Sequence, residues 1–344
     1  MAGSRGERLS KPPAVARVLE RVTSTVRRHE MFLPGECVLV SVSGGPDSMC
    51  LLHSLVRLQR LFRIHLEVFH FDHAMRRDSA QDAAYVARAA TALGVPVHLE
   101  RAEESRDAEL SPEHWAREVR RAATGRVLLE TGAARVAVAH TVDDQAETVL
   151  IAAMTGSGLD GLAGIKPVLG TWVQPMIEVT RSEVEAFCSA LRLRPRRDPT
   201  NRDTSLLRNA VRLRGLPALE RATGRDVRVP IARTASILQE DADLLKEKAL
   251  PAINELVEEE PDGVSLPVAG LLALPMPVAA RVVHAAILRS GSPAQRDHVD
   301  AVLDLARGRP GRRADLGRGL NARRDREYLH LSRTSPLDRE RGRS

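Results

Sequence analysis

The residues most able to do chemistry form a short turn after an apolar, valine-rich stretch. In order, they are Ser43, Gly44, Gly45, Pro46, Asp47 and Ser48. The glycines let a phosphate approach the backbone, the serines offer hydroxyl donors, and proline suits the first turn of a following helix. Backbone amides in such a turn converge on an anion at the positive end of the helix. Asp47 would be useful there mainly for holding Mg²⁺. The turn predicts a nucleotide-phosphate site, although the Gly-x-x-x-x-Gly-Lys pattern of the common P-loop is absent.

A second polar group joins a later predicted strand to its helix. Asp144 and Glu147 are three residues apart, which places both on one helical face directed toward the expected pocket. With His140 nearby they indicate a functional site, in which oxygen ligands favour Mg²⁺ or an ammonium group over zinc. A structural role stays open, because acidic residues at a helix N-terminus also stabilise the helix dipole.

A third group, His70, Asp72 and His73, lies where another predicted strand ends. Two histidines beside an aspartate could hold a metal ion. The alternation of strand positions favours instead a turn that lines the adenosine part of a nucleotide pocket. We therefore expect Asp72 and His73 to contact the nucleotide.

Three arginines in the predicted catalytic domain are candidate contacts for an anion. Arg117 offers a fork of donors that suits phosphate or carbonyl oxygens, with an exposed helix arginine as the alternative. Arg208 and Arg212 are four residues apart on one helical face, so they could contact one phosphate together. Ion pairs with Asp198 or Asp203 are the structural alternative.

A basic cluster occupies the C-terminal part of the chain. Its members are Arg312, Arg313, Arg318, Arg323 and Arg324. Such a cluster could follow the phosphates of a nucleic acid, or it could be a solvated face with no partner.

The composition narrows the class of protein. The net charge of +6 and the pI of about 9.8 favour an anionic partner such as nucleic acid. The 344 residues contain no apolar stretch long enough for a membrane span and no apolar signal-peptide core, so we expect a cytoplasmic protein without membrane contact. Cys37, Cys50 and Cys188 are far apart, which argues against disulfides, a zinc site and an iron–sulfur cluster.

Short valine-rich strands alternate with amphipathic helices after an N-terminal helix. We expect strands at Cys37–Ser43, His65–Phe71, Val95–Arg101 and Arg135–His140, and helices at Asp47–Leu61, Ala80–Leu93, Ser111–Thr131 and Asp143–Met154. This order predicts an α/β fold with a doubly wound, mostly parallel sheet, which binds ligands beyond the carboxyl ends of its strands.

The remaining chain is predicted to be mainly helical. A glycine-rich loop at Gly156–Gly170 and a helix at Thr180–Leu191 come first, and helices without alternating strands follow at Ile231–Leu256, Val268–Leu272, Pro275–Arg289 and Arg296–Ala306. We therefore expect a helical extension (residues 1–33), a catalytic domain (34–216), a smaller mainly helical domain (217–335) and a disordered tail (336–344).

The turn at Ser43–Ser48 resembles the Ser-Gly-Gly-x-Asp-Ser signature of the PP-loop ATP pyrophosphatases. The run from Ala139 to Thr148, the glycines of Gly158–Gly164 and the stretch from Asp198 to Arg212 are similar to the tRNA(Ile)-lysidine synthetase family. Pro310–Leu316 resembles the end of that family's second domain. The resemblance covers about Val38 to Leu331 and is densest before Arg214.

This resemblance implies an activity. Family members use ATP to adenylate C2 of the wobble cytidine in a CAU-anticodon tRNA(Ile), and the ε-amine of L-lysine then displaces AMP to form lysidine. It implies that Asp144 and Glu147 hold lysine, that Asp47 holds Mg²⁺-pyrophosphate, and that Arg117 contacts cytidine or adenylate. Arg208, Arg212, Arg312 and Arg313 would contact tRNA, and the protein would be a homodimer.

Three other functions compete with this one. A PP-loop cytidine thiolase would need paired cysteines for a cluster or persulfide, and this chain has no such pair. A small-molecule synthetase would need no tRNA and would leave the basic second domain without a purpose. An RNA-binding protein with a vestigial nucleotide fold is disfavoured by the intact turn at Ser43–Ser48.

Overall fold

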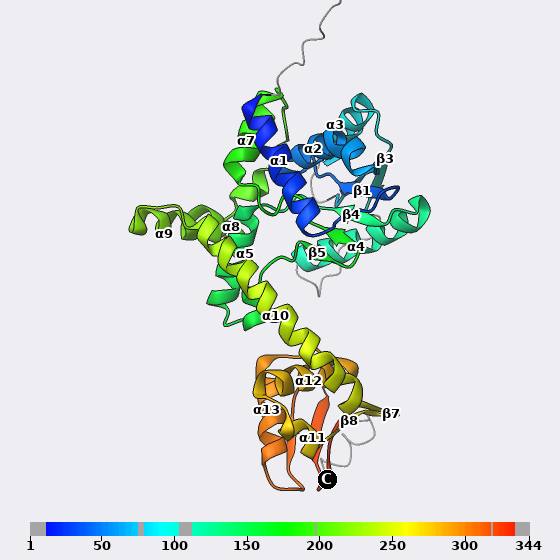
Figure 1. Cartoon of the computed structure of the whole chain (residues 1–344), viewed down its shortest axis with the longest axis vertical. Helices are drawn as coiled ribbons and strands as arrows, with labels where there is room; N and C mark the ends of the chain where they lie inside the picture. Colours follow the sequence, from blue (N-terminus) through cyan, green and yellow to red (C-terminus); the bar gives the residue numbers. More distant parts are fainter. Residues whose placement is uncertain (1–11, 75–78, 103–111, 197, 318, 334–344) are drawn as a thin grey trace, which may run out of the picture. The chain divides into compact units, whose positions relative to one another are not determined.

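The structure, a computed structural model, describes residues 12–74, 79–102, 112–196, 198–317 and 319–333 (Figure 1). For residues 112–114, 117, 199 and 201 it describes the backbone alone. The expected tail and Arg318 lie outside the described residues. The chain divides into two compact units, Met1–Leu238 and Gln239–Ser344. The division falls inside helix α10 (Arg228–Leu256), whereas the change to helices without alternating strands suggested a boundary at residue 217.

A six-stranded sheet forms the centre of the first unit, in the order β3-β2-β1-β4-β6-β5. The strands are β1 (Cys37–Ser41), β2 (His65–Asp72), β3 (Val97–Arg101), β4 (Arg135–Ala137), β5 (Val168–Leu169) and β6 (Trp172–Val173). Neighbours are parallel except β5 and β6, which pair antiparallel. The predicted doubly wound, mostly parallel sheet is therefore confirmed.

Helices cover both faces of this sheet. They are α1 (Pro13–Arg28), α2 (Pro46–Phe62), α3 (Ser79–Ala92), α4 (Pro112–Thr131), α5 (Val142–Met154), α6 (Leu159–Leu162) and α7 (Arg181–Ala190). Val38 and Val40 of β1 pack into one cluster with residues of α1, α2, α3 and α7, while Leu39 packs with α4 in another. Successive strand residues point to opposite faces, so a valine-rich strand buried on both sides is continuously apolar.

Local sequence patterns explain most of the helix and strand boundaries, with two exceptions. Helix α7 begins where predicted, because Thr180 and Glu183 form a reciprocal capping box. The prediction of a plain loop at Gly156–Gly170 was wrong, since α6 and β5 lie within it. Strand β4 ends at Ala137, three residues before the predicted end at His140.

Short helices lead from α7 to the end of the first unit. They are η1 (Pro199–Arg202), α8 (Leu207–Ala210), the π-helical turn η2 (Val211–Gly215) and α9 (Leu216–Thr223), followed by α10. Val211 and Leu216 are buried against Ala146 of α5, so this connection packs beside the helix that carries Asp144 and Glu147.

The second unit contains helices and a sheet that the sequence analysis missed. Helices α11 (Val268–Ala273), α12 (Met276–Arg289) and α13 (Arg296–Arg307) match the predicted segments closely. Five antiparallel strands, in the order β7-β8-β11-β10-β9, are β7 (Glu258–Glu260), β8 (Gly263–Pro267), β9 (Arg313–Asp315), β10 (Leu320–Arg324) and β11 (Tyr328–Arg333). The expectation of helices without strands was wrong here, because strands this short carry little local signal. None of the described helices combines the length and apolarity needed to cross a membrane.

Candidate functional site

The turn between β1 and α2 has the geometry of an anion cradle. Gly44 has φ +87°, a value that L-residues rarely adopt. Gly45 caps α2, and Pro46 occupies its first turn. The two serines brace the turn, since Ser43 N donates to Ser48 Oγ (3.2 Å) and Ser48 Oγ donates to Gly45 O (3.0 Å). The strand, turn and helix thus occur in the order that phosphate binding requires.

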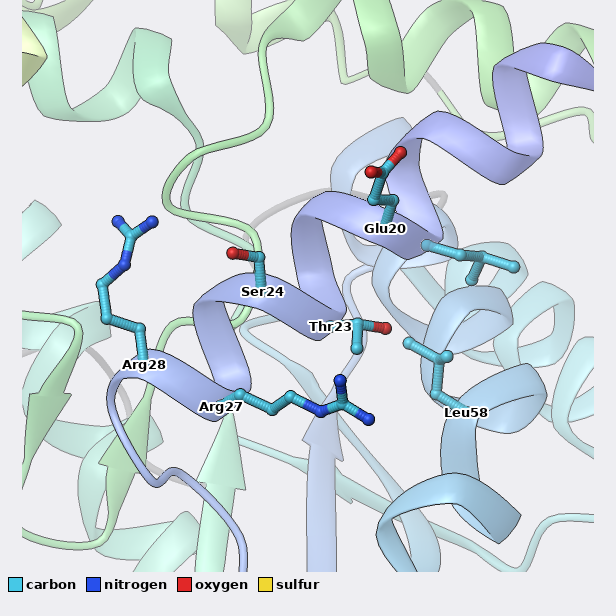
Figure 2. A pocket seen from close by; sticks show the side chains of 7 residues that line it. Glu20, Thr23, Ser24, Arg27, Arg28 and Leu58 are labelled. Atoms are coloured by element: carbon cyan, nitrogen blue, oxygen red, sulfur yellow. The ribbon is translucent and has the colours of Figure 1, made fainter.

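A cavity of about 1350 Å³ opens beside this turn, within the first unit. Of the predicted site residues, Ser43, Gly45, Pro46, Asp47, Ser48, Asp144 and Arg212 line it. The lining does not include the other predicted residues Gly44, Asp72, His73, Glu147 and Arg208. The side chain of Arg117 lies outside the described atoms. A second cavity of about 740 Å³, lined by residues of α1 and α2, contains no predicted site residue (Figure 2).

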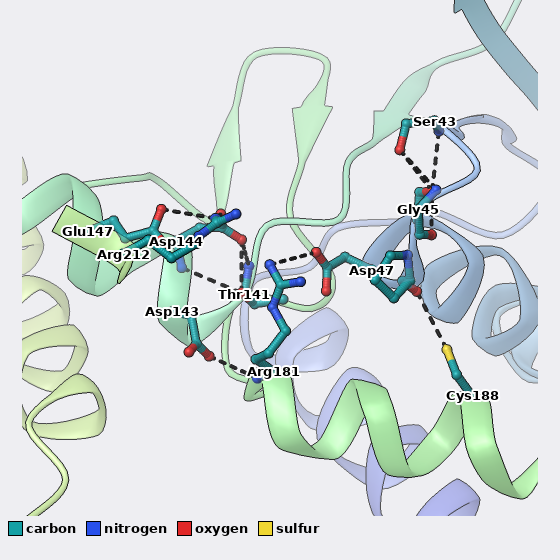
Figure 3. Close-up of polar contacts among 12 residues, drawn as sticks. Ser43, Gly45, Asp47, Thr141, Asp143, Asp144, Glu147, Arg181, Cys188 and Arg212 are labelled. Carbon is teal, nitrogen blue, oxygen red and sulfur yellow. Dashed lines mark hydrogen bonds and ion pairs between the residues drawn. The ribbon is translucent and has the colours of Figure 1, made fainter. Parts of the chain in front are cut away.

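Asp47 is the acidic residue of the turn. Its Oδ2 forms an ion pair with Nη2 of Arg181, at a distance of 3.2 Å (Figure 3). Among the described residues, its buried Oδ1 has no hydrogen-bond partner. Burial raises the pKa of Asp47 to about 6, against the opposing effect of Arg181. A buried carboxylate oxygen without a partner fits Mg²⁺, which in nucleotide sites binds one or two carboxylates together with substrate phosphates.

Asp144 and Glu147 form a four-charge cluster with Arg208 and Arg212. Figure 3 shows Arg212 beside the two carboxylates. Arg208 Nε donates to Glu147 Oε2 (2.8 Å), and Arg212 Nη2 donates to the same oxygen (3.0 Å). Arg212 Nε donates to Glu147 Oε1. Both guanidinium groups reach Asp144 Oδ1, at 3.2 and 3.1 Å. The two arginines therefore pair with the acids of α5, and not with Asp198 or Asp203, as the structural alternative supposed.

Asp144 has a second, structural role at the start of α5. Its Oδ2 accepts from the backbone and hydroxyl of Thr141, which caps the helix. Burial alone would raise the pKa of Asp144, but Arg208, His140 and Arg212 outweigh it and lower that pKa below its usual value. Asp144 is therefore ionised at neutral pH.

Asp72 and His73 do not line the cavity. Asp72 accepts from Ala74 N (2.8 Å) and Ser79 Oγ (3.0 Å), so its carboxylate holds the turn and the start of α3. Burial lowers the pKa of His73 to about 4, which keeps it neutral. His70 is buried, with Nδ1 2.7 Å from Val42 O. This geometry supports a bracing role for Asp72, and nucleotide contact by Asp72 and His73 stays a prediction.

Four arginines that the sequence analysis did not select line the cavity, namely Arg120, Arg181, Arg196 and Arg202. Arg181, which pairs with Asp47, has its backbone N held by Asp143 Oδ2 (2.8 Å). Arg196 donates its backbone N to Gly44 O (2.9 Å) and its Nε to Asp82 (2.7 Å). The capping box at Thr180 was the available signal for Arg181, because it places that side chain at a helix start beyond the sheet edge.

The predicted basic cluster lies in the second unit. Arg312 and Arg313 are both exposed. Arg313 stands opposite Arg323 across strands β9 and β10. This arrangement presents positive charge at one edge of the five-stranded sheet.

Two family models match the chain. A PP-loop domain covers residues 16–219, and a TilS substrate binding domain covers residues 266–330. Within the described residues, no group of three or more His, Cys, Asp or Glu is arranged to hold a metal ion.

The curated relatives of this chain include several tRNA(Ile)-lysidine synthases. A tRNA(Ile)-lysidine synthase of Symbiobacterium thermophilum is 38% identical over 84% of this chain and 63% of its own length. One of Geobacillus kaustophilus is 31% identical over 88% of this chain and 68% of its own length. The chain spans 63%, 58% and 54% of the length of three such relatives.

Among solved structures, a U34-tRNA thiolase, NcsA from Methanococcus maripaludis with its [4Fe-4S] cluster, superposes with a TM-score of 0.57. The match covers 66% of this chain and 80% of that one at 17% identity, which shows a shared fold alone. On the domain matches and on the identity with the Geobacillus relative, the chain belongs to the tRNA(Ile)-lysidine synthase family of PP-loop proteins.

Proposed function

We propose that this protein joins L-lysine to C2 of the wobble cytidine in a CAU-anticodon tRNA(Ile), with ATP as co-substrate. One observation carries the proposal: the phosphate turn and Asp144 of α5 line one cavity, in a member of this family. The products would be AMP, pyrophosphate and lysidine-bearing tRNA. A tRNA substrate also favours a cytoplasmic location.

In the first step, the C2 oxygen of cytidine attacks the α-phosphorus of ATP and pyrophosphate leaves. Backbone amides of the Ser43–Ser48 turn and the hydroxyl of Ser43 would bind the charge that develops on the phosphates. Asp47 would hold Mg²⁺, which when bound offsets the charge of the departing pyrophosphate. Arg181 is placed to contact the same phosphates, because it lines the cavity beside Asp47.

In the second step, the ε-amine of lysine attacks C2, and AMP leaves with the C2 oxygen. Adenylation makes this oxygen a good leaving group. Asp144 and Glu147 would bind the cationic lysine, which must then lose a proton to become nucleophilic. Asp144 is suited to binding the ammonium group, since it is ionised at neutral pH and lines the cavity.

The tRNA would contact basic residues. Arg312 and Arg313 are exposed and suited to phosphate contacts. Arg117 stays a candidate for cytidine or adenylate. Because Arg208 and Arg212 already pair with carboxylates, they are weaker candidates for tRNA phosphates in this arrangement. The homodimer implied by the family resemblance stays a prediction.

The cysteine environment disfavours a thiolase. Cys37, Cys50 and Cys188 are free thiols, and Cys50 and Cys188 are buried. Burial raises the pKa of Cys188 to about 11 and raises that of Cys50 further. Thiols that stay protonated are poor nucleophiles and poor cluster ligands.

A lysine-transfer assay tests the proposed function. The full chain is incubated with ATP, Mg²⁺, labelled lysine and a CAU-anticodon tRNA(Ile) transcript, and label retained in the tRNA is counted. The matched control is the CAU-bearing methionine tRNA, which should not be labelled. No transfer, or equal transfer into both tRNAs, would contradict the proposal.

A further inference from the structure

The acidic pair assigned to lysine is fully occupied in this structure. Every carboxylate oxygen of Asp144 and Glu147 accepts at least one hydrogen bond from Arg208, Arg212 or Thr141. Glu147 retains only 1% side-chain exposure. An incoming ammonium group would have to compete with these donors for the carboxylate oxygens, and it would find almost no solvent access to Glu147.

The charges of the cluster also balance. Two carboxylates face two guanidinium groups, so the cluster is neutral before lysine arrives. Adding a third cation would leave one positive charge in excess at a largely buried site, which is costly. If one arginine leaves, the cluster carries a single negative charge and complements one ammonium group. Lysine binding therefore requires an arginine to move.

Arg212 is the arginine placed to move. It lines the cavity with Asp47 and Ser48, whereas Arg208 does not. A polyphosphate in that cavity would offer the guanidinium fork several charged oxygens, the ligands it binds most strongly. Arg212 also lies in the π-helical turn Val211–Gly215. Such turns are irregular, weakly hydrogen-bonded points in a helix and occur often at functional sites.

We propose that Arg208 and Arg212 close the lysine site and that nucleotide phosphate opens it by drawing Arg212 away from Glu147. Nucleotide then binds before lysine, and free lysine does not occupy the site of the empty enzyme. This order protects the cavity from an abundant amine until ATP is in place. The inference rests on the proposed lysine-binding role of Asp144 and Glu147.

The test measures lysine binding rather than turnover. L-lysine is titrated calorimetrically into the full chain alone and into the chain saturated with Mg²⁺ and an ATP analogue blocked between the α- and β-phosphates. We expect the analogue to tighten lysine binding at least about tenfold, within the usual range of coupling between two sites. Arg212→Gln should bind lysine without nucleotide, with an affinity near that of the nucleotide-loaded wild type.

Arg214→Gln is the matched control, because Arg214 lies on the same turn, is exposed and lies outside the cluster. It should behave as the wild type. If Arg212→Gln fails to fold, Arg208→Gln replaces it, since its loss also leaves one net negative charge.

Two results would overturn the inference: wild-type lysine affinity that does not depend on the analogue, or an arginine variant that binds lysine no better without it. If the wild type still transfers lysine to tRNA, only the binding order fails. If transfer is absent as well, the proposed function fails with it.

Discussion

Replacing Glu147 with glutamine should destabilise the first unit of the protein. Glu147 accepts three hydrogen bonds from two arginines and is almost fully buried. Glutamine has nearly the same shape, but it loses the charge and turns an N–H₂ group toward guanidinium donors. The cluster would be left with two cations and one anion.

The size of the effect follows from what the arginines can still contact. Removing one partner of a fully buried ion pair costs about 3–5 kcal/mol. Here the side chains of Arg208 and Arg212 keep 42% and 26% exposure, and both still contact Asp144. Water and Asp144 thus reduce the penalty, and we expect the free energy of unfolding to fall by about 2 kcal/mol. For a unit of this size that is a drop in Tm of about 4–8 °C.

Tryptophan fluorescence during urea unfolding measures this change in the correct unit, because both tryptophans, Trp115 and Trp172, belong to the first unit. Glu130→Gln is the control, since Glu130 is an exposed glutamate on α4. The double variant Glu147→Gln with Arg212→Gln should lose less than the sum of the two single variants. If Glu147→Gln unfolds at the same urea concentration as Glu130→Gln, the cluster contributes nothing to stability and the reasoning is refuted.

Three further predictions concern the nucleotide site and the basic edge. Asp47→Ala should abolish ATP-dependent adenylation of tRNA, measured as pyrophosphate release; near-normal release would remove Asp47 from the site. Because the pKa of Asp47 is raised to about 6, the folded state binds its proton more tightly than the unfolded state, and ionisation weakens folding as pH rises from about 4 to about 6. Without Mg²⁺ and nucleotide, the Asp47→Asn variant should therefore be more stable than the wild type at pH 7 but not at pH 4. Urea unfolding of both proteins at both pH values measures this difference, and an equal difference at the two pH values would count against the raised pKa. Arg312→Gln with Arg313→Gln should weaken tRNA binding and reduce its salt dependence by about two counterions, and an unchanged salt slope would show that these arginines are only solvated.

Local sequence patterns were sufficient to predict the structure of those segments whose conformation is determined by neighbouring residues. The turn after β1 needs Gly44 at positive φ and Pro46 at a helix start, and both requirements are visible in the sequence. The capping box at Thr180 located α7 for the same reason. The strands β7 to β11 were missed because each is short, and because the pairing of β8 with β11, which joins them into one sheet, connects residues distant in sequence.

By itself the sequence determined the parallel sheet, the phosphate turn and the acidic pair of α5, because each depends on periodicity or on contacts within a few residues. Only the tertiary structure decided how the charges pair. Arg208 and Arg212 lie more than sixty residues from Glu147 along the chain, and they meet it because Val211 and Leu216 pack against Ala146. Asp198 and Asp203 were the alternative partners left open by the sequence, but packing places the arginines beside α5. The two carboxylates predicted to bind lysine are therefore, in the folded protein, paired with two arginines.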